Sequence, residues 1–401
     1  MNKIFDYIKG DKVIWITVLF MALSSILLVY SSVVTLAYRY QDGNTFYYIL
    51  KHGLFIVTGF ALIFLIHKVN HRYFSRIGQL VFWVSIPLLL LTLLIGTNIN
   101  AASRWLTIPV INQTFQTSDL AKLGLILFLA RLLTVQAHQI KKLKKSFLPA
   151  LVATGAVCAL ILPANFSTAA VVFMSAMMLM FMAGIPVKHL SLVIPAGIIA
   201  IILIFSTAKI APEVFPRAET WTKRVERYLN NEKADANADY QVEQAKIAIA
   251  TGGITGKGPG NSTQRNFLPH SSSDFIYAIV LEEYGLIGGL IILMFYMILL
   301  YRAVRIAQKT PYTFGAYLVL GLSFSLVFQG LINMAVNVNL LPVTGQPLPL
   351  VSMGGTSLWF TCISLGIILS VSRTVEESEE TQENTNPEQS SQNKPITDVA
   401  T

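Results

Sequence analysis

The sequence contains little charge and little cysteine. Asp, Glu, Lys and Arg make up 13% of its 401 residues, whereas hydrophobic residues make up 54%. A soluble domain has roughly a quarter of its residues charged, so this composition excludes an ordinary soluble fold. The two cysteines, Cys158 and Cys362, lie in apolar stretches, which excludes a disulfide framework and a thiolate metal site. The net charge of +9 comes from short, scattered basic blocks, which argues against nucleic-acid binding.

Long apolar runs fill most of the chain. A bilayer core about 30 Å thick is crossed by about 20 helical residues. The first run follows a basic amino terminus but has no small-residue cleavage site, so we expect it to be retained. We predict an all-α polytopic membrane protein of about ten transmembrane helices, near residues 14–34, 48–66, 80–95, 120–133, 147–162, 169–183, 190–205, 284–300, 314–332 and 358–371.

The basic residues alternate between the two sides of this predicted bundle. Short loops on one side contain little more than Arg39 and Arg104. By the positive-inside rule both termini are therefore predicted to be cytoplasmic. The segments on that side contain Lys3, Lys9, Lys12, Lys68, Arg72, Arg76, Arg131, Lys141, Lys142, Lys144, Lys145, Lys188, Arg302, Arg305 and Lys309.

Two segments break the pattern of short connections. Residues 206–283, between the seventh and eighth spans, form a large extracytoplasmic loop with charges of both signs, longer than an ordinary connection. We expect an ordered, functional loop. Residues 376–401, rich in Glu, Gln, Asn, Ser and Pro, cannot bury a core and are expected to be a disordered cytoplasmic tail. The predicted transmembrane domain is thus 1–375.

Charged groups near the fourth span are candidates for function. Asp119 and Lys122 share one helical face because they are three residues apart. They are either a structural ion pair or a substrate contact. Just before them, Trp105 is either an interfacial anchor or part of a site in which Arg104 holds a pyrophosphate, whose oxygens match the planar guanidinium.

Three later motifs are also candidates. The glycine-dense segment 252–262 either presents N–H groups to an anion or is a flexible turn, and it lacks the P-loop pattern. Asp274 lies where the polar loop meets an apolar segment, so it is either a partly buried general base or, like Ser273, a helix N-cap. Glu282 and Glu283 could simply mark the start of the eighth span.

The carboxyl third combines a polar stripe with a Pro- and Gly-rich segment. Gln329, Asn333 and Asn337 are spaced by four residues and share one helical face. Residues 341–357 contain too much Pro and Gly for a simple span. Non-helical backbone at membrane depth must be buried in protein or line a wet cavity.

These motifs together resemble the SEDS family (shape, elongation, division and sporulation), over about residues 10–373. The resemblance rests on 102–105, 115–122, the glycine-rich segment, 267–277 and 341–357. It implies a peptidoglycan glycosyltransferase that polymerises lipid II, an undecaprenyl-pyrophosphate disaccharide-pentapeptide, on the outer face of the cytoplasmic membrane. The overall look of the Trp105 and 341–357 regions favours the FtsW-like division branch over the RodA-like elongation branch.

The resemblance also implies roles for individual residues. Asp274 matches the family's catalytic aspartate. The implied partners are a class B penicillin-binding transpeptidase, other division or elongation proteins and membrane lipids, but no nucleic acid. A divalent cation, magnesium or manganese, could assist, although the sequence shows no dedicated metal cluster. The implied substrate-binding residues are Arg104, Trp105, Asp119, Lys122, Arg224, Ser262, Gln264, Ser352, Gly354 and Gly355.

The sequence departs from the family pattern at three places. His270 and Ser272 stand where a Glu and a His usually precede the catalytic aspartate, Asn165 replaces an Asp, and Asp119 replaces a Glu. Two rival functions, lipid II translocation and a partner-recruiting scaffold, remain open. Translocation predicts essential ionisable groups deep in the spans, whereas the acidic residues outside the termini cluster at the outer boundary and in the large loop. A scaffold predicts that Asp274 is dispensable.

Overall fold

The computed structural model describes residues 9–99, 102–108, 113–193 and 236–385, with the single positions 195, 197 and 206. The predicted all-α membrane architecture is confirmed. Nine of the ten predicted runs lie in helices of the described residues, namely α2 (Lys12–Ser32), α4 (Thr45–His67), α5 (Tyr73–Ile95), α6 (Thr117–Val135), α7 (Leu148–Ile161), α8 (Phe166–Met182), α13 (Ile276–Lys309), α14 (Thr313–Asn337) and α15 (Thr356–Thr385).

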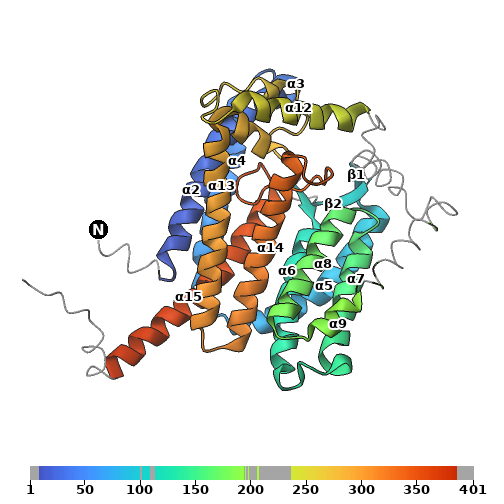
Figure 1. Ribbon diagram of the computed structural model, residues 1–401, viewed down its shortest axis with the longest axis vertical. Coiled ribbons are helices and arrows are strands. Elements are labelled where there is room, and N and C mark those ends of the chain that lie inside the picture. Colours follow the sequence, from blue (N-terminus) through green and yellow to red (C-terminus); the bar gives the residue numbers. More distant parts are fainter. Residues whose placement is uncertain are drawn as a thin grey trace, which may run out of the picture.

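The helices form one bundle with α14 and α15 at its centre (Figure 1). α2 and α13 lie on one side of these two helices, and α5 to α8 lie on the other. Seven helical segments of the described chain are long and apolar enough to cross a membrane; α8 is a shorter apolar helix of 17 residues. Of the seven segments, α14 and α15 are the most buried, while α4 and α5 are the least buried, with 28% of each apolar window buried, as expected for helices that face lipid.

Side-chain caps fix where several helices begin. The Asp11 carboxylate accepts hydrogen bonds from the N–H groups of Val13 and Ile14 at the start of α2. Asn44 caps α4 in the same way, and Asn165 caps α8. These caps satisfy N–H groups that have no partner inside the helix. The replacement of an Asp by Asn165 therefore leaves a residue that still starts a helix.

The seventh predicted span, 190–205, lies mostly outside the described residues. The short helix α9 (Val187–Ser191) precedes it. The described part of the large loop begins with α12 (Ala236–Gly252), which lies across one end of the bundle next to α3 (Val34–Tyr40) (Figure 1). From Tyr240 onward this part of the loop packs against α13, whereas the expected order and function of the whole loop 206–283 stay a prediction because 207–235 lie outside the described residues.

A small antiparallel sheet, absent from the sequence-based prediction, lies at the same end of the bundle. It has the order β1 (Thr97–Ile99), β2 (Ala102–Ile108), β3 (Gln113–Gln116). Strand β3 continues directly into α6. The sheet thus sets the position from which the Asp119 helix starts.

The carboxyl-terminal helix is longer than its apolar run. α15 continues to Thr385, beyond the predicted boundary at 375, and residues 386–401 lie outside the described part. Arg373 and Glu377 form an i,i+4 ion pair at 2.8 Å in this extension, which supports a polar helix. The predicted tail therefore begins within a helix.

Candidate active site

Asp274 lies just before α13, where its side chain is half-buried. Its main-chain carbonyl accepts hydrogen bonds from the side-chain amides of Asn333 and Asn337, at 2.9 and 3.0 Å. The N-cap of α13 is Phe275, whose side chain forms no capping hydrogen bond, and the Ala278 N–H in the first turn donates instead to Oδ1 of Asn337 at 3.0 Å. The alternative in which Ser273 or Asp274 caps the helix is therefore wrong. Two amides of the polar stripe on α14 instead hold the backbone of Asp274.

The Pro- and Gly-rich segment 341–357 packs against the same backbone. Ser352 donates from its hydroxyl to the carbonyl of Ser273 at 2.6 Å, and the Met353 N–H donates to the carbonyl of Ser272 at 2.9 Å. Residues 341–355 are non-helical and extensively buried in protein, as the sequence predicts, and α15 begins at Thr356. Gly345 adopts φ +65°, and a Cβ built there would lie 3.4 Å from Oδ2 of Asp274. The Asp274 carboxylate thus faces this segment.

The polar side chains of α14 also donate hydrogen bonds to the backbone of segment 341–357. Asn333 donates to the carbonyl of Gln346 at 2.7 Å, and Gln329 donates to the carbonyl of Pro347 at 3.0 Å. The Gln346 side chain in turn donates to Thr168 at 2.6 Å, in the first turn of α8. In a helix these carbonyls would accept hydrogen bonds from the helix itself, but in the non-helical segment they need other donors. The side-chain amides of Gln329 and Asn333 supply these donors.

Asp119 and Lys122 join this network as the predicted pair. The Lys122 ammonium lies 3.9 Å from the Asp119 carboxylate, and both side chains are nearly buried. Lys122 also donates to Oε1 of Gln329 at 2.7 Å. The chain of contacts from Lys122 through Gln329 to Pro347 brings the ion pair to the segment that faces Asp274. The contact is structural; a role for either side chain in substrate binding stays a prediction.

Trp105 lies on β2, where it is half-buried and opposite Gln116 of β3. Thr356 donates to the carbonyl of Thr114 at 3.1 Å, which ties β3 to the start of α15. Gly354 and Gly355 directly precede that contact. The sheet therefore places Trp105 on the side of the site formed by the end of segment 341–357. The side chain of Arg104 and all of Arg224 lie outside the described residues.

The glycine-rich segment has a structural role that the sequence did not reveal. α13 is interrupted at Gly285, whose φ is 65° and ψ −164°. The N–H groups of Lys257 and Gly258 donate to the carbonyls of Glu282 and Glu283, at 3.0 and 2.9 Å, on one side of this break. On the other side, Leu286 and Ile287 donate to the carbonyls of residues 253 and 254. The N–H groups of Lys257 and Gly258 thus bind the broken helix and are not free for an anion, while anion binding by the rest of the segment stays a prediction.

Ser262 and Gln264 lie beside that break and contact Glu282. The Glu282 carboxylate is fully buried and accepts hydrogen bonds from the Ser262 hydroxyl at 2.5 Å and the Gln264 N–H at 3.1 Å. Lys257 pairs with the same carboxylate at 2.6 Å. The structure thus gives both residues a protein partner, and their substrate-binding role stays a prediction.

Glu282 and Glu283, which the sequence suggested could simply mark the start of the eighth span, lie inside α13 and form a buried cluster. Both carboxylates are buried, and Glu283 accepts a hydrogen bond from Ser31 of α2. Arg265 donates to both the carbonyl and the hydroxyl of Ser31, at 3.2 and 3.1 Å. Sequence reasoning missed this cluster because the helix break that buries the acids depends on contacts with residues about 30 positions earlier. The only local signal for this buried cluster was the pair of glutamates directly before Tyr284 and Gly285.

A divalent cation that assists the reaction stays a prediction, which the described residues do not test. No group of three or more His, Cys, Asp or Glu side chains lies together within them. Ser272, at a position where the family pattern has a His, is buried and its carbonyl is bound by Met353. His270 is exposed in a left-handed turn, with φ 63°.

Comparison with known proteins identifies the family. The model of the cell cycle protein family FtsW/RodA/SpoVE matches residues 11–377. A protein of Nitrosococcus halophilus named probable peptidoglycan glycosyltransferase FtsW is 31% identical over 337 residues, which are 82% of this chain and 84% of the relative. Stage V sporulation protein E of Bacillus subtilis is 30% identical over 365 residues, covering 89% and 95% of the two chains.

Solved structures share the fold over nearly the whole chain. A structure described as the coordination of polymerization and crosslinking by a peptidoglycan synthase complex matches with a TM-score of 0.69 and 26% identity, over 91% of this chain and 98% of the other. The rod shape determining protein RodA of Thermus thermophilus matches with a TM-score of 0.64 and 25% identity, over 91% and 97%. The predicted SEDS resemblance is confirmed: this integral membrane protein belongs to the FtsW/RodA/SpoVE family of cell cycle proteins.

Proposed function

We propose that this chain is a peptidoglycan glycosyltransferase that polymerises lipid II into glycan strands on the outer face of the cytoplasmic membrane. The observation that carries the proposal is the placement of Asp274. Its half-buried carboxylate lies at the end of the helix bundle where α13 begins. Its backbone carbonyl is held by the side-chain amides of Asn333 and Asn337 on α14. The names of the relatives support the same reaction class.

In the proposed step Asp274 acts as a general base. The 4-hydroxyl oxygen of the acceptor sugar attacks the anomeric carbon of the donor, and the bond from that carbon to the lipid pyrophosphate breaks. The hydroxyl proton passes to the Asp274 carboxylate, while the bond electrons leave with the pyrophosphate. Attack opposite to the leaving group inverts the anomeric carbon and gives a β-1,4 link. A positioned base of this kind contributes about 10²–10⁴-fold to a rate.

The remaining candidates would bind the substrate around that base. Arg104, Arg224 and Lys122 offset the charge of the leaving pyrophosphate, since cations aimed at developing charge stabilise a transition state. Trp105 and Ser352 lie on elements that border segment 341–357. Asp119, Ser262, Gln264, Gly354 and Gly355 complete the proposed substrate-binding set, Asp119 through its pairing with Lys122.

The orientation follows from the positive-inside rule. We place both termini in the cytoplasm and Asp274 at the outer face, because the basic segments then lie inside. A class B penicillin-binding transpeptidase is the proposed partner, as the solved complex with the matching fold couples polymerization to crosslinking. We further propose the division branch, with septal wall synthesis as the role; localisation along the side wall instead of the septum would contradict it.

The test is polymerisation of lipid II by the purified protein, with and without the transpeptidase. We expect the wild-type protein to produce glycan strands. The polymerisation rate of Asp274→Asn should be about 10²–10⁴-fold lower. Glu380→Gln is the matched control, because it also removes one carboxylate but lies on α15, in an exposed pair with Lys9. Wild-type activity in the Asp274 variant would contradict the base assignment. If the wild-type protein polymerised no lipid II either with or without the transpeptidase, the glycosyltransferase assignment would be contradicted.

A further inference from the structure

The non-helical segment that faces Asp274 is also held from α2. Its residue Ser352 donates to the carbonyl of Ser273, directly before the candidate base. The carbonyl of the preceding residue, Val351, accepts a hydrogen bond from the hydroxyl of Ser25 at 2.8 Å. Ser25 is fully buried in α2, so this bond joins a membrane-spanning helix to the backbone beside the base.

A buried histidine fixes the direction in which the Ser25 hydroxyl donates. Nε2 of His52, on α4, lies 2.8 Å from Oγ of Ser25, and His52 is 2% exposed. A hydroxyl has one proton. Because Ser25 donates that proton to Val351, the bond between the two side chains is donated by Nε2–H of His52. Nδ1 of His52 is then the bare nitrogen, and it is buried without a hydrogen-bond partner among the described residues.

Val351 ends a turn whose backbone is strained. Its N–H donates to the carbonyl of Leu348 at 3.2 Å, across Pro349 and Leu350. Leu350 has a φ of 65°, a left-handed conformation that turns with proline at the second position usually give to Gly or Asn at the third. Such strain persists only where surrounding contacts fix it, and it gathers at functional sites. The turn therefore depends on hydrogen bonds from outside to keep its shape.

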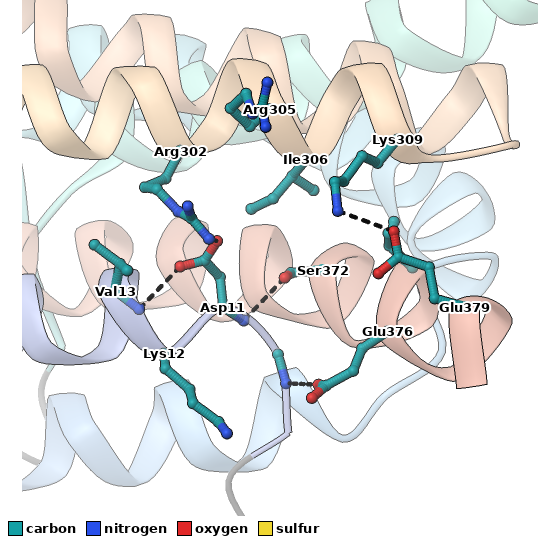
Figure 2. Close-up of a pocket in the computed structure, with 12 residues that line it drawn as sticks. Asp11, Lys12, Val13, Arg302, Arg305, Ile306, Lys309, Ser372, Glu376 and Glu379 are labelled. Carbon is teal, nitrogen blue, oxygen red and sulfur yellow. Dashed lines mark hydrogen bonds and ion pairs between the residues drawn. The ribbon is translucent and has the colours of Figure 1, made fainter. Parts of the chain in front are cut away.

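Two helices supply these hydrogen bonds. Besides Ser25 of α2, Tyr296 of α13 donates from its buried hydroxyl to the carbonyl of Pro349 at 2.5 Å. The two helices are also joined at their other end, where Arg302 of α13 donates to the Asp11 carboxylate at the start of α2, at 2.7 Å (Figure 2). The strained turn is thus held between two helices that are fixed to one another.

α2 also holds the other side of the backbone before Asp274. The carbonyl of Ser32, about two helical turns after Ser25, accepts a hydrogen bond from the hydroxyl of Ser271 at 3.2 Å. At a rise of 1.5 Å per residue the two contacts are about 10 Å apart along the helix. The contacts form a closed ring, from Ser25 to the strained turn, from the turn to the residues before Asp274, and from these back to α2.

We propose that Ser25 and His52 are positioning residues for Asp274, an inference that rests on the proposed glycosyltransferase function. His52 orients the Ser25 hydroxyl, Ser25 holds the strained turn, and the turn holds the backbone directly before the base. Both side chains are buried in the bundle and act through that backbone. A base must stay within hydrogen-bond reach of the proton that it takes, so opening the ring slows the chemical step and leaves the substrate contacts in place.

The first test is lipid II polymerisation by the full-length protein in detergent. We expect Ser25→Ala and His52→Leu to lower kcat by about 10–10²-fold, since a misplacement of about 1 Å costs about 10²-fold, and to leave KM almost unchanged. His52→Gln should keep most of the wild-type kcat, because its amide N–H reaches the position of Nε2, whereas His52→Asn is one carbon shorter and should not. Thr17→Val is the control, because it removes a buried hydroxyl of α2 whose hydrogen bond stays within its own helix.

The second test is amide hydrogen exchange of the same variants without substrate, which reports local opening. We expect faster exchange in residues 348–353 and 272–274 of Ser25→Ala and His52→Leu. Exchange in α7, on the other side of the bundle, should stay unchanged (Figure 1). Thermal unfolding of each variant checks that the fold is retained.

Several results would overturn the proposal. One is wild-type kcat in both Ser25→Ala and His52→Leu, even with faster exchange, because the ring would then be structural without positioning the base. Another is an equal loss of kcat in His52→Gln and His52→Leu, which would contradict the role of Nε2. If the wild-type protein polymerised no lipid II, the glycosyltransferase proposal itself would fail, and the exchange measurement would still decide whether Ser25 and His52 hold the turn.

Discussion

The two ends of α2 and α13 are held together by different chemistry. At the Asp274 end, Glu282, Ser262 and Asn333 are at most 3% exposed and are held mainly by buried hydrogen bonds, to which the Lys257–Glu282 ion pair adds. At the opposite end, where α2 begins and α13 ends, ion pairs join the helices: Arg302 pairs with Asp11, and Lys309 with Glu379. Lys309 and Glu379 are 52% and 54% exposed. Exposed pairs contribute little to stability, whereas buried polar groups are costly to leave unpaired. The first end is therefore held mainly by buried hydrogen bonds, and the second depends more on ion pairs that water can reach.

Glu282→Ala tests the stronger end and should have the largest effect on stability. It removes the acceptor for Lys257, Ser262 and the loop N–H groups around them. Removing one partner of a buried charge pair costs about 3–5 kcal/mol, which thermal unfolding in detergent would report. Glu243→Ala on the exposed face of α12 is the control. A midpoint equal to that of the control would mean that the buried cluster is not structural.

Gly285→Ala tests the helix break itself. The backbone at φ 65° and ψ −164° is accessible almost only to glycine, and an added Cβ would lie 2.5 Å from the nitrogen of Gly256. We expect a loss of about 3 kcal/mol, the upper end of the cost of such backbone strain. Gly155→Ala in α7, where a Cβ meets nothing within 4 Å, is the matched control and should be neutral or stabilising. Equal stability of the two variants would contradict the strain.

Asn333→Asp tests how the backbone of the base is held. The change keeps the size of the side chain but removes the donor for the carbonyls of Asp274 and Gln346. We expect a loss of about 1–3 kcal/mol in stability and a fall in kcat with little change in KM, since the base is displaced while the substrate contacts remain. Lipid II polymerisation rates measure the second effect. Gln308→Glu, on the exposed part of α13, controls for the added charge. Unchanged kcat would show that Asn333 does not position Asp274.

Lys309→Gln should have the smallest effect. The exposed pair with Glu379 is worth about 0–1 kcal/mol. Arg302→Gln at the same end should cost more, because it leaves the buried carboxylate of Asp11 without its cation. Thermal unfolding of the two variants side by side measures the difference. If Lys309→Gln proved as destabilising as Glu282→Ala, the contrast between the two ends would be lost.

The candidate site shows where sequence reasoning succeeded. The spacing of Gln329, Asn333 and Asn337 predicts one polar face, and all three side chains indeed point to the same network. Asp119 and Lys122 were predicted to meet because they are three residues apart, and they do. Both predictions concern neighbours on one helix, whose geometry is local.

The sequence alone determined the membrane architecture, the positions of nine helices and the family, because apolar length and short motifs are local properties of the chain. Only the tertiary structure shows that α13 is interrupted at Gly285 and that Glu282 is buried. It also shows that the glycine-rich segment forms hydrogen bonds with the backbone groups on both sides of this interruption. Each of these depends on segments that are distant in sequence exchanging hydrogen bonds. Whether a carboxylate or a glycine is exposed depends on what packs over it, and no local pattern contains that information.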